Sequence, residues 1–189
     1  MINFPTFITL FRIFVIPFVV FFIYLDFWAG DYIASILFGM ACLSDYLDGH
    51  LARSWGQISG IGTFLDPIAD KLLVSITLLF LVAIGRIEGF SLIPASIILM
   101  REIFVSGLRE FLAGLKVNIR VSLLAKWKTS LQMLSLILLI LGPTDPFELD
   151  FEFIGLSCLW ISAMLTAITA YDYWKIGFKK IIKTNTFHN

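Results

Sequence analysis

Residues 45–70 read DYLDGHLARSWGQISGIGTFLDPIAD and place four aspartates, Asp45, Asp48, Asp66 and Asp70, in a largely apolar chain. On an α-helix, residues three or four apart lie on one face, with Cβ atoms about 5–6 Å apart. Asp45 and Asp48 therefore share one helix face, and so do Asp66 and Asp70. Because the connection between the pairs is short, the two helices are expected to be antiparallel neighbours. The sequence thus predicts that four carboxylates converge between them.

The composition predicts a protein whose solvent is lipid. Of the 189 residues, 59% are hydrophobic and 15% are charged, and the mean hydropathy is +0.91. A soluble domain carries about 25% charged residues. The formal net charge is zero, and no basic run is interleaved with aromatic residues as a nucleic-acid groove requires. These features favour a membrane protein over a soluble domain or a nucleic-acid-binding protein.

Six apolar stretches are candidates for membrane-spanning helices, which need about 20 mostly apolar residues. They cover residues 7–25, 32–53, 63–85, 89–112, 121–141 and 153–174. The first is not expected to be a signal peptide, because Asp26-Phe27-Trp28 offers no small-residue cleavage site and more spans follow. We predict an all-α protein with six transmembrane helices, in which residues 1–189 form a single transmembrane catalytic domain.

The charged residues of these spans gather on one side of the membrane. If six helices alternate in direction, that side holds thirteen basic and seven acidic residues, and the other holds Arg86 and seven acidic residues. The positive-inside rule places the more basic side in the cytoplasm. The sequence therefore predicts that both termini and the four aspartates face the cytoplasm.

Four ionised carboxylates at a membrane boundary need compensating cations, because they repel one another and lose hydration. Two divalent ions balance four such charges, as in two-metal sites whose ions lie about 3.5–4 Å apart. Oxygen donors favour Mg²⁺ or Mn²⁺ over Zn²⁺. Gly49 and Ala52 leave room for a base or a diphosphate beside the backbone, as does Gly62 across the gap. Arg53 is placed to reach a phosphate.

Two plainer explanations compete with a metal site. Aspartates and arginines at helix ends also form interfacial salt bridges, and cation transporters also use intramembrane carboxylates. A transporter's carboxylates are expected near mid-bilayer on broken helices, whereas these are predicted at one surface. Cys42 and Cys158 lack the spacing of a metal or disulfide motif, and two histidines are too few for a histidine-based site. The aspartate spacing therefore favours an oxygen-ligated site.

At these residues the sequence resembles the CDP-alcohol phosphotransferase family, whose signature is D-x2-D-G-x2-A-R, a short gap, then G-x3-D-x3-D. Every fixed position is matched between Asp45 and Asp70. The resemblance implies a six-helix fold and a homodimer. It also implies transfer of a phosphatidyl group from a CDP-linked lipid to an alcohol, with release of CMP.

The resemblance further implies roles for single residues. Asp45 and Asp66 are expected to bind both metals, Asp48 one of them and Asp70 the other, and Asp70 is also the expected general base. Four more residues are expected to contact the nucleotide diphosphate of CDP-diacylglycerol: Gly49, Ala52, Arg53 and Ser59.

Residues 10–12, 101–110 and 125–129 resemble one branch of the family, the bacterial phosphatidylglycerophosphate synthases of the cytoplasmic membrane, which use glycerol 3-phosphate. Arg101 and Arg109 lie eight residues apart, near one helix face. With Lys126 and Lys128, which open the next span, they form a cationic cluster. We expect Arg101, Arg109 and Lys126 to bind the acceptor phosphate, since arginine forks suit phosphate oxygens. Pairing with neighbouring glutamates, or binding of lipid headgroups, is the alternative for these cations.

The expected mechanism is an in-line attack on the β-phosphorus by a glycerol 3-phosphate hydroxyl whose proton passes to Asp70. Within the family, serine, inositol phosphate and phosphatidylglycerol are alternative acceptors. Outside it, an aspartate-rich prenyltransferase and a divalent-cation transporter are the alternatives.

Overall fold

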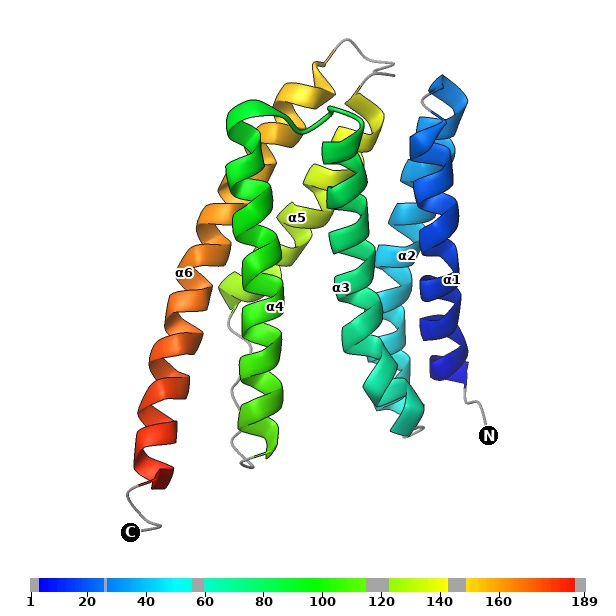
Figure 1. The fold of residues 1–189 in the computed structure, drawn as a ribbon. Helices are drawn as coiled ribbons and strands as arrows, with labels where there is room; N and C mark the ends of the chain where they lie inside the picture. Colours follow the sequence, from blue (N-terminus) through cyan, green and yellow to red (C-terminus); the bar gives the residue numbers. More distant parts are fainter. Residues whose placement is uncertain (1–3, 26, 56–59, 115–122, 143–148, 186–189) are drawn as a thin grey trace. The chain divides into compact units, whose positions relative to one another are not determined.

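The structure, a computed structural model, describes residues 4–25, 27–55, 60–114, 123–142 and 149–185. These form six α-helices with a short 3₁₀-helix, η1 (Gly89–Ser91), before the fourth (Figure 1). The helices are α1 (Phe4–Tyr24), α2 (Trp28–Trp55), α3 (Gly60–Ala83), α4 (Leu92–Gly114), α5 (Leu123–Leu141) and α6 (Phe151–Asn185). No described residue lies in a strand. The predicted all-α, six-helix fold is confirmed.

The last helix is longer than the sequence indicated. The predicted span ends at residue 174, but α6 continues to Asn185 and has 35 residues, which is about 52 Å at 1.5 Å per residue. The hydropathy pattern detects only the apolar part, because the residues after Trp174 are mostly polar or basic. The helix begins at Phe151, two residues before the predicted start, and the Asp150 side chain acts as its N-cap by accepting a hydrogen bond of 3.1 Å from the N–H of Phe153.

Within the described ranges, three helical segments are long and apolar enough to cross a membrane: Phe7–Tyr24, Gly89–Gly114 and Phe151–Lys175. Two further apolar segments, Trp28–Ser44 and Trp127–Leu141, are shorter. Many large apolar side chains are exposed, such as Phe14, Met100 and Met164. Polar side chains such as Thr9, Gln132 and Ser135 are buried. This distribution is typical of helices whose outer surface meets lipid, so the chain is a membrane protein.

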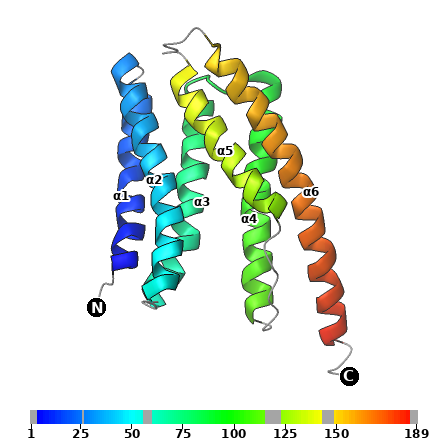
Figure 2. The same ribbon diagram turned by 180° about the vertical axis from the view of Figure 1, so that it is seen from behind.

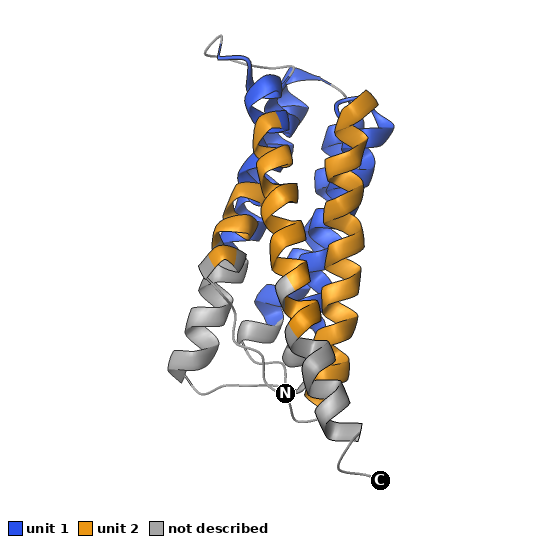
Figure 3. Cartoon of the chain, turned by 90° about the vertical axis from the view of Figure 1, so that its left-hand side faces the viewer, with its two compact units in different colours: residues 1–88, 133–156 blue, residues 89–132, 157–189 orange. Residues whose placement is uncertain are grey.

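The helices form two compact units, which are coloured separately in Figure 3. Unit 1 comprises Met1–Glu88 and Met133–Leu156, and unit 2 comprises Gly89–Gln132 and Ser157–Asn189. Helices α5 and α6 contribute to both units. The expected single catalytic domain stays a prediction.

In unit 1, α1 packs against both α2 and α3 (Figures 1 and 2). The three helices alternate in direction, so the end of α2 and the start of α3 lie at the same end of the unit as the start of α1. The contacts are apolar along most of the helix length, with Val19, Ile23, Phe38 and Leu78 fully buried. This packing brings the two halves of the aspartate motif to one end of unit 1.

A buried ion pair lies at the other end of unit 1. Gly85, with φ of 77°, ends α3 in a Schellman motif: its N–H bonds to the Val82 carbonyl, and the N–H of Arg86 bonds to the Leu81 carbonyl. The turn directs Arg86 to Asp31 of α2, with 2.7 Å between Nη2 and Oδ1, and to the carbonyl of Ile140 in α5. Both charged side chains are buried, so the pair links three helices.

Candidate active site

The aspartate motif lies on two helices, as predicted. Positions 45, 48, 49, 52 and 53 belong to α2, and positions 66 and 70 belong to α3. The side chains of Asp45, Asp48, Gly49, Ala52 and Arg53 lie outside the described part of the structure, and Ser59 lies outside it entirely. Asp66 and Asp70 are therefore the predicted site residues of the motif whose surroundings can be stated.

Asp66 and Asp70 each contact a polar side chain of α1. The hydroxyl of Thr9 donates to Oδ1 of Asp66, and Nη1 of Arg12 forms an ion pair with Oδ1 of Asp70. Thr9 and Arg12 are one turn apart on α1, and the two aspartates are one turn apart on α3. The contacts are therefore matched turn by turn, so α1 fixes the positions of both carboxylates.

Arg12 connects three helices at this end of unit 1. Its side chain is fully buried, while that of Asp70 is 40% exposed. Its Nε also donates to Oγ of Ser44 in α2 over 3.5 Å, and that hydroxyl donates to the carbonyl of Ala41. A buried arginine held on two sides presents its charge to Asp70 in a fixed orientation, while Asp70 keeps a face open to a ligand.

The described carboxylates suit a hard divalent cation. Asp66 and Asp70 offer only oxygen donors, lie on adjacent turns of α3 and are both half-buried, which matches the ligands that Mg²⁺ and Mn²⁺ take. Among the side chains that the structure describes, no three His, Cys, Asp or Glu residues form a group that could hold a metal ion. The other two predicted ligands, Asp45 and Asp48, are not among those side chains.

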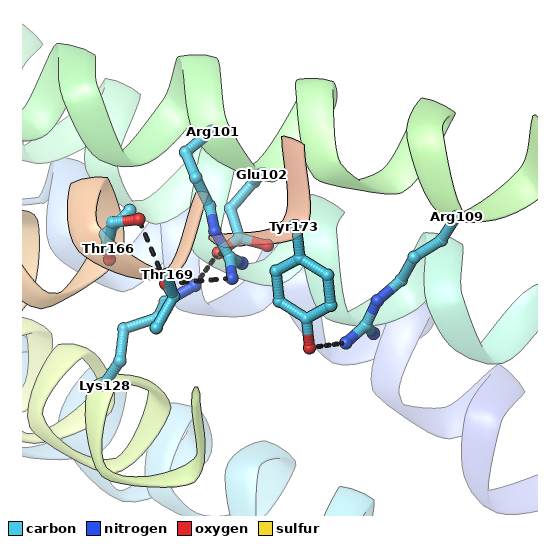
Figure 4. Close-up of polar contacts among 7 residues, drawn as sticks. All are labelled: Arg101, Glu102, Arg109, Lys128, Thr166, Thr169 and Tyr173. Atoms are coloured by element: carbon cyan, nitrogen blue, oxygen red, sulfur yellow. Dashed lines mark hydrogen bonds and ion pairs between the residues drawn. The ribbon is translucent and has the colours of Figure 1, made fainter. Parts of the chain in front are cut away.

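Unit 2 contains a second cluster of polar and charged side chains, shown in Figure 4, in which cations outnumber carboxylates. Glu102 of α4 forms ion pairs with Lys128 of α5 and, over 3.3 Å, with Nη1 of Arg101. Nη2 of Arg101 donates to Oγ1 of Thr169 in α6 over 3.4 Å. The Lys128 side chain is 3% exposed and that of Glu102 is 19% exposed. Such buried charges need partners on neighbouring helices, and Glu102 supplies one carboxylate to two cations.

Arg109 joins this group through Tyr173 of α6. Nη2 of Arg109 donates to the Tyr173 hydroxyl over 2.7 Å. The guanidinium carbons of Arg109 and Arg101 lie 4.9 Å and 5.9 Å from the centre of the Tyr173 ring. Figure 4 shows the ring between the two arginines. Arg101 contacts Thr169, and Arg109, further along α4, contacts Tyr173, further along α6. Helices α4 and α6 therefore pack side by side and run in the same direction.

The structure brings Arg101 and Arg109 together, as expected for a phosphate site. The side chain of Lys126, the third expected cation, lies outside the described part. The alternative that these cations pair with neighbouring glutamates is observed in part, because Glu102 pairs with Arg101 and Lys128. Sequence reasoning missed Thr9 and Tyr173, which carry no motif: a threonine or tyrosine in an apolar helix is ordinarily a packing residue.

Comparison with known proteins gives one consistent result. Residues 2–168 match the family described as CDP-alcohol phosphatidyltransferase. A protein of Rickettsia typhi named CDP-diacylglycerol–glycerol-3-phosphate 3-phosphatidyltransferase is 42% identical over 173 residues, covering 92% of this chain and 96% of the relative. Proteins of the same name from Rickettsia prowazekii and Cereibacter sphaeroides are 42% and 35% identical, each covering 92% of this chain and 94% of the relative. The similarity therefore extends across both units.

Proposed function

Because the chain belongs to the CDP-alcohol phosphatidyltransferase family, we propose that it transfers the phosphatidyl group of CDP-diacylglycerol to glycerol 3-phosphate. The products are phosphatidylglycerophosphate and CMP, so the enzyme acts in phospholipid biosynthesis. The relatives named for this reaction match the chain over nearly the whole length of both, which supports both substrates.

The observation that carries the chemistry is the pair of carboxylates on α3, each held by a polar side chain of α1. We assign Asp45, Asp48, Asp66 and Asp70 as ligands of two divalent cations, Mg²⁺ or Mn²⁺. When bound, these cations neutralise the charge of the donor's diphosphate. The contacts proposed for the nucleotide diphosphate are Gly49, Ala52, Arg53 and Ser59.

Asp70 is the proposed general base for the acceptor hydroxyl. Its partial exposure gives a hydroxyl access to the carboxylate, and Arg12 holds the carboxylate from the buried side. The proton moves from the acceptor hydroxyl to Asp70 as the hydroxyl oxygen attacks the β-phosphorus in line. The bond from that phosphorus to the bridging oxygen of the diphosphate breaks, and this oxygen leaves with CMP. A positioned base of this kind contributes roughly 10²–10⁴-fold to the rate.

The acceptor's phosphate is assigned to the cations of unit 2. Arg101, Arg109 and Lys126 are the proposed ligands. Arg101, Arg109 and Lys128 carry three positive charges against one on Glu102, so the described cluster has a net charge of about +2. A dianionic phosphate is complementary to that charge, and a zwitterion such as serine is not.

The proposed location is the bacterial cytoplasmic membrane, with six crossings and both termini in the cytoplasm. The excess of lysine and arginine on one side of the alternating helices supports this orientation. The expected assembly is a homodimer.

One assay tests the function. The purified protein is reconstituted into phosphatidylcholine vesicles with Mg²⁺ and CDP-diacylglycerol. Glycerol 3-phosphate, serine, inositol phosphate or phosphatidylglycerol is then added, and CMP release is measured for each. We expect CMP release with glycerol 3-phosphate and at least tenfold less with the others. A different preferred alcohol would refute the acceptor, and metal transport into the vesicles without CMP release would refute the enzyme.

The Asp70→Asn variant tests the base within the same assay. The amide keeps the shape of the side chain but cannot take a proton, so turnover should fall roughly 10²–10⁴-fold while CDP-diacylglycerol still binds. Glu88, an exposed acidic residue that belongs to neither cluster, provides the Glu88→Gln control, for which wild-type turnover is expected. Near-normal turnover of Asp70→Asn would show that another group takes the proton.

A further inference from the structure

Tyr173 of α6 occupies a position that packing alone does not explain. Its side chain is buried, yet its ring faces the guanidinium groups of two arginines that lie two turns apart on α4. Two like charges on one side of a helix repel each other. The negative face of an aromatic ring attracts both, so Tyr173 offsets that repulsion from a second helix.

The hydroxyl of Tyr173 adds a directional contact. It accepts a hydrogen bond of 2.7 Å from Nη2 of Arg109, which fixes the rotation of that guanidinium. Arg101 is held in a different way, by Glu102 and by Thr169. Among the described residues, each arginine is therefore held through only some of its five N–H groups.

The described part of the cluster also contains buried polar atoms without a hydrogen-bond partner. Among the described residues, neither Nε of Arg101 nor Oγ1 of Thr166 has a hydrogen-bond partner. Buried donors without partners are costly in a helix bundle, and phosphate oxygens would accept from them. Lys128 and Glu102 lie in the same group (Figure 4), with one carboxylate for three cations.

We infer that Tyr173 is a positioning residue that holds Arg101 and Arg109 as a pair for the phosphate of the acceptor. The inference rests on the proposed function, because it takes the acceptor to be glycerol 3-phosphate. In this arrangement Tyr173 does not touch the reacting atoms. It sets the affinity for a phosphorylated alcohol through the two arginines, and therefore contributes to acceptor specificity.

Two variants separate the ring from the hydroxyl. Tyr173→Phe keeps the ring and removes the hydrogen bond to Arg109, and Tyr173→Leu removes both. A hydrogen bond to a charged group is worth roughly a factor of ten in affinity, and each cation–ring contact a further factor of roughly two to five. The KM for glycerol 3-phosphate should rise roughly tenfold in Tyr173→Phe and roughly 50-fold or more in Tyr173→Leu. The KM for CDP-diacylglycerol should stay within about twofold of wild type.

Two control variants lie on the same helix. Tyr171→Leu makes the same chemical change at an exposed tyrosine, and Trp174→Leu removes an aromatic contact of 5.7 Å with Phe104 of α4. Neither should change the KM for glycerol 3-phosphate. If Trp174→Leu raised it as much as Tyr173→Leu does, or if Tyr173→Phe left it unchanged, Tyr173 would serve only to pack α6 on α4 and the inference would be overturned.

Two further measurements separate the role of Tyr173 from the proposed function and from binding of lipid headgroups. Wild-type CMP release with glycerol 3-phosphate reports the proposed function, whereas the ratio of variant to wild-type KM reports the role of Tyr173. Direct binding of glycerol 3-phosphate to the nucleotide-free protein should weaken by the same factor in Tyr173→Phe, and equal affinity would overturn the inference. The KM ratio should also be the same in phosphatidylcholine vesicles with and without phosphatidylglycerol. A ratio that departs from one only with the anionic lipid would assign the arginines to lipid headgroups instead, and would overturn the inference.

Discussion

Replacing Arg12 by lysine is expected to slow turnover while leaving the protein folded. Arg12 is fully buried, forms an ion pair with Asp70 of α3 and donates from Nε to Ser44 of α2. Lysine keeps the positive charge but carries one nitrogen at the end of a flexible chain. It cannot maintain both contacts in the geometry of a planar guanidinium, so the Asp70 carboxylate loses its fixed orientation.

The size of the effect follows from the contact that is lost. A hydrogen bond to a charged group contributes about 1.5–3 kcal/mol, and 1.36 kcal/mol corresponds to a tenfold change in rate. If that contact orients Asp70 for proton transfer, kcat should fall roughly 10- to 150-fold. The KM for CDP-diacylglycerol should change much less, because Arg12 is fully buried and its ion pair is with Asp70, the proposed base.

The assay is CMP release at saturating glycerol 3-phosphate, with thermal unfolding measured on the same preparations. Arg86→Lys is the matched control, since Arg86 is also buried in unit 1 and paired with an aspartate, but lies at the opposite end from the motif. Arg86→Lys should lower the unfolding temperature and leave kcat unchanged. A kcat for Arg12→Lys within twofold of wild type, or an equal loss in both variants, would refute the positioning of Asp70 by Arg12.

Three further predictions concern the metals, the cationic cluster and the Arg86–Asp31 ion pair of unit 1. Chelation with EDTA should abolish CMP release, and Mg²⁺ or Mn²⁺, but not Na⁺, should restore it; activity that survives exhaustive chelation would refute the metal assignment. Lys128→Gln lowers the net charge of the cluster from about +2 to +1, so the KM for glycerol 3-phosphate should rise roughly tenfold with the KM for the donor unchanged. Asp31→Asn leaves Arg86 buried without its carboxylate, so the free energy of unfolding should fall by about 3–5 kcal/mol; an unchanged urea or thermal midpoint in detergent would show that the pair contributes nothing to stability.

The helices were predictable because their signal is local. A run of apolar residues that is followed by a glycine such as Gly85, or preceded by an aspartate such as Asp150, specifies a membrane helix without knowledge of its neighbours. The spacing of Asp66 and Asp70 likewise fixes their shared helix face. The extension of α6 to Asn185 was missed, since a hydropathy pattern ends where apolar residues end although the helix continues.

The contacts between helices were not predictable from one sequence. Thr9 and Asp66 are 57 residues apart, and Arg12 and Asp70 are 58 apart. Periodicity shows which residues share a face, but many pairings of six apolar helices bury similar areas. The position of Tyr173 is a case of the same kind, because an aromatic residue near the end of an apolar helix usually packs or sits at the interface. Only the fold places it beside two arginines.

The ion pairs of the two units differ in a way that relates to function. Lone charges are expensive among membrane helices, and three buried cations, Arg12, Arg86 and Lys128, each pair with a carboxylate from another segment of the chain. Arg86 and Asp31 are 7% and 2% exposed, so neither side chain is accessible to a ligand. In the Arg12–Asp70 and Lys128–Glu102 pairs the cation is equally buried, at 0% for Arg12 and 3% for Lys128, but the carboxylate is more exposed, at 40% for Asp70 and 19% for Glu102. A carboxylate fixed by a buried cation on one side and open on the other can meet a metal, a proton or a competing anion without losing its position. By this criterion we expect Arg86–Asp31 to stabilise the packing of the helices, whereas Arg12–Asp70 and Lys128–Glu102 position groups for the proposed reaction and for the proposed binding of the acceptor.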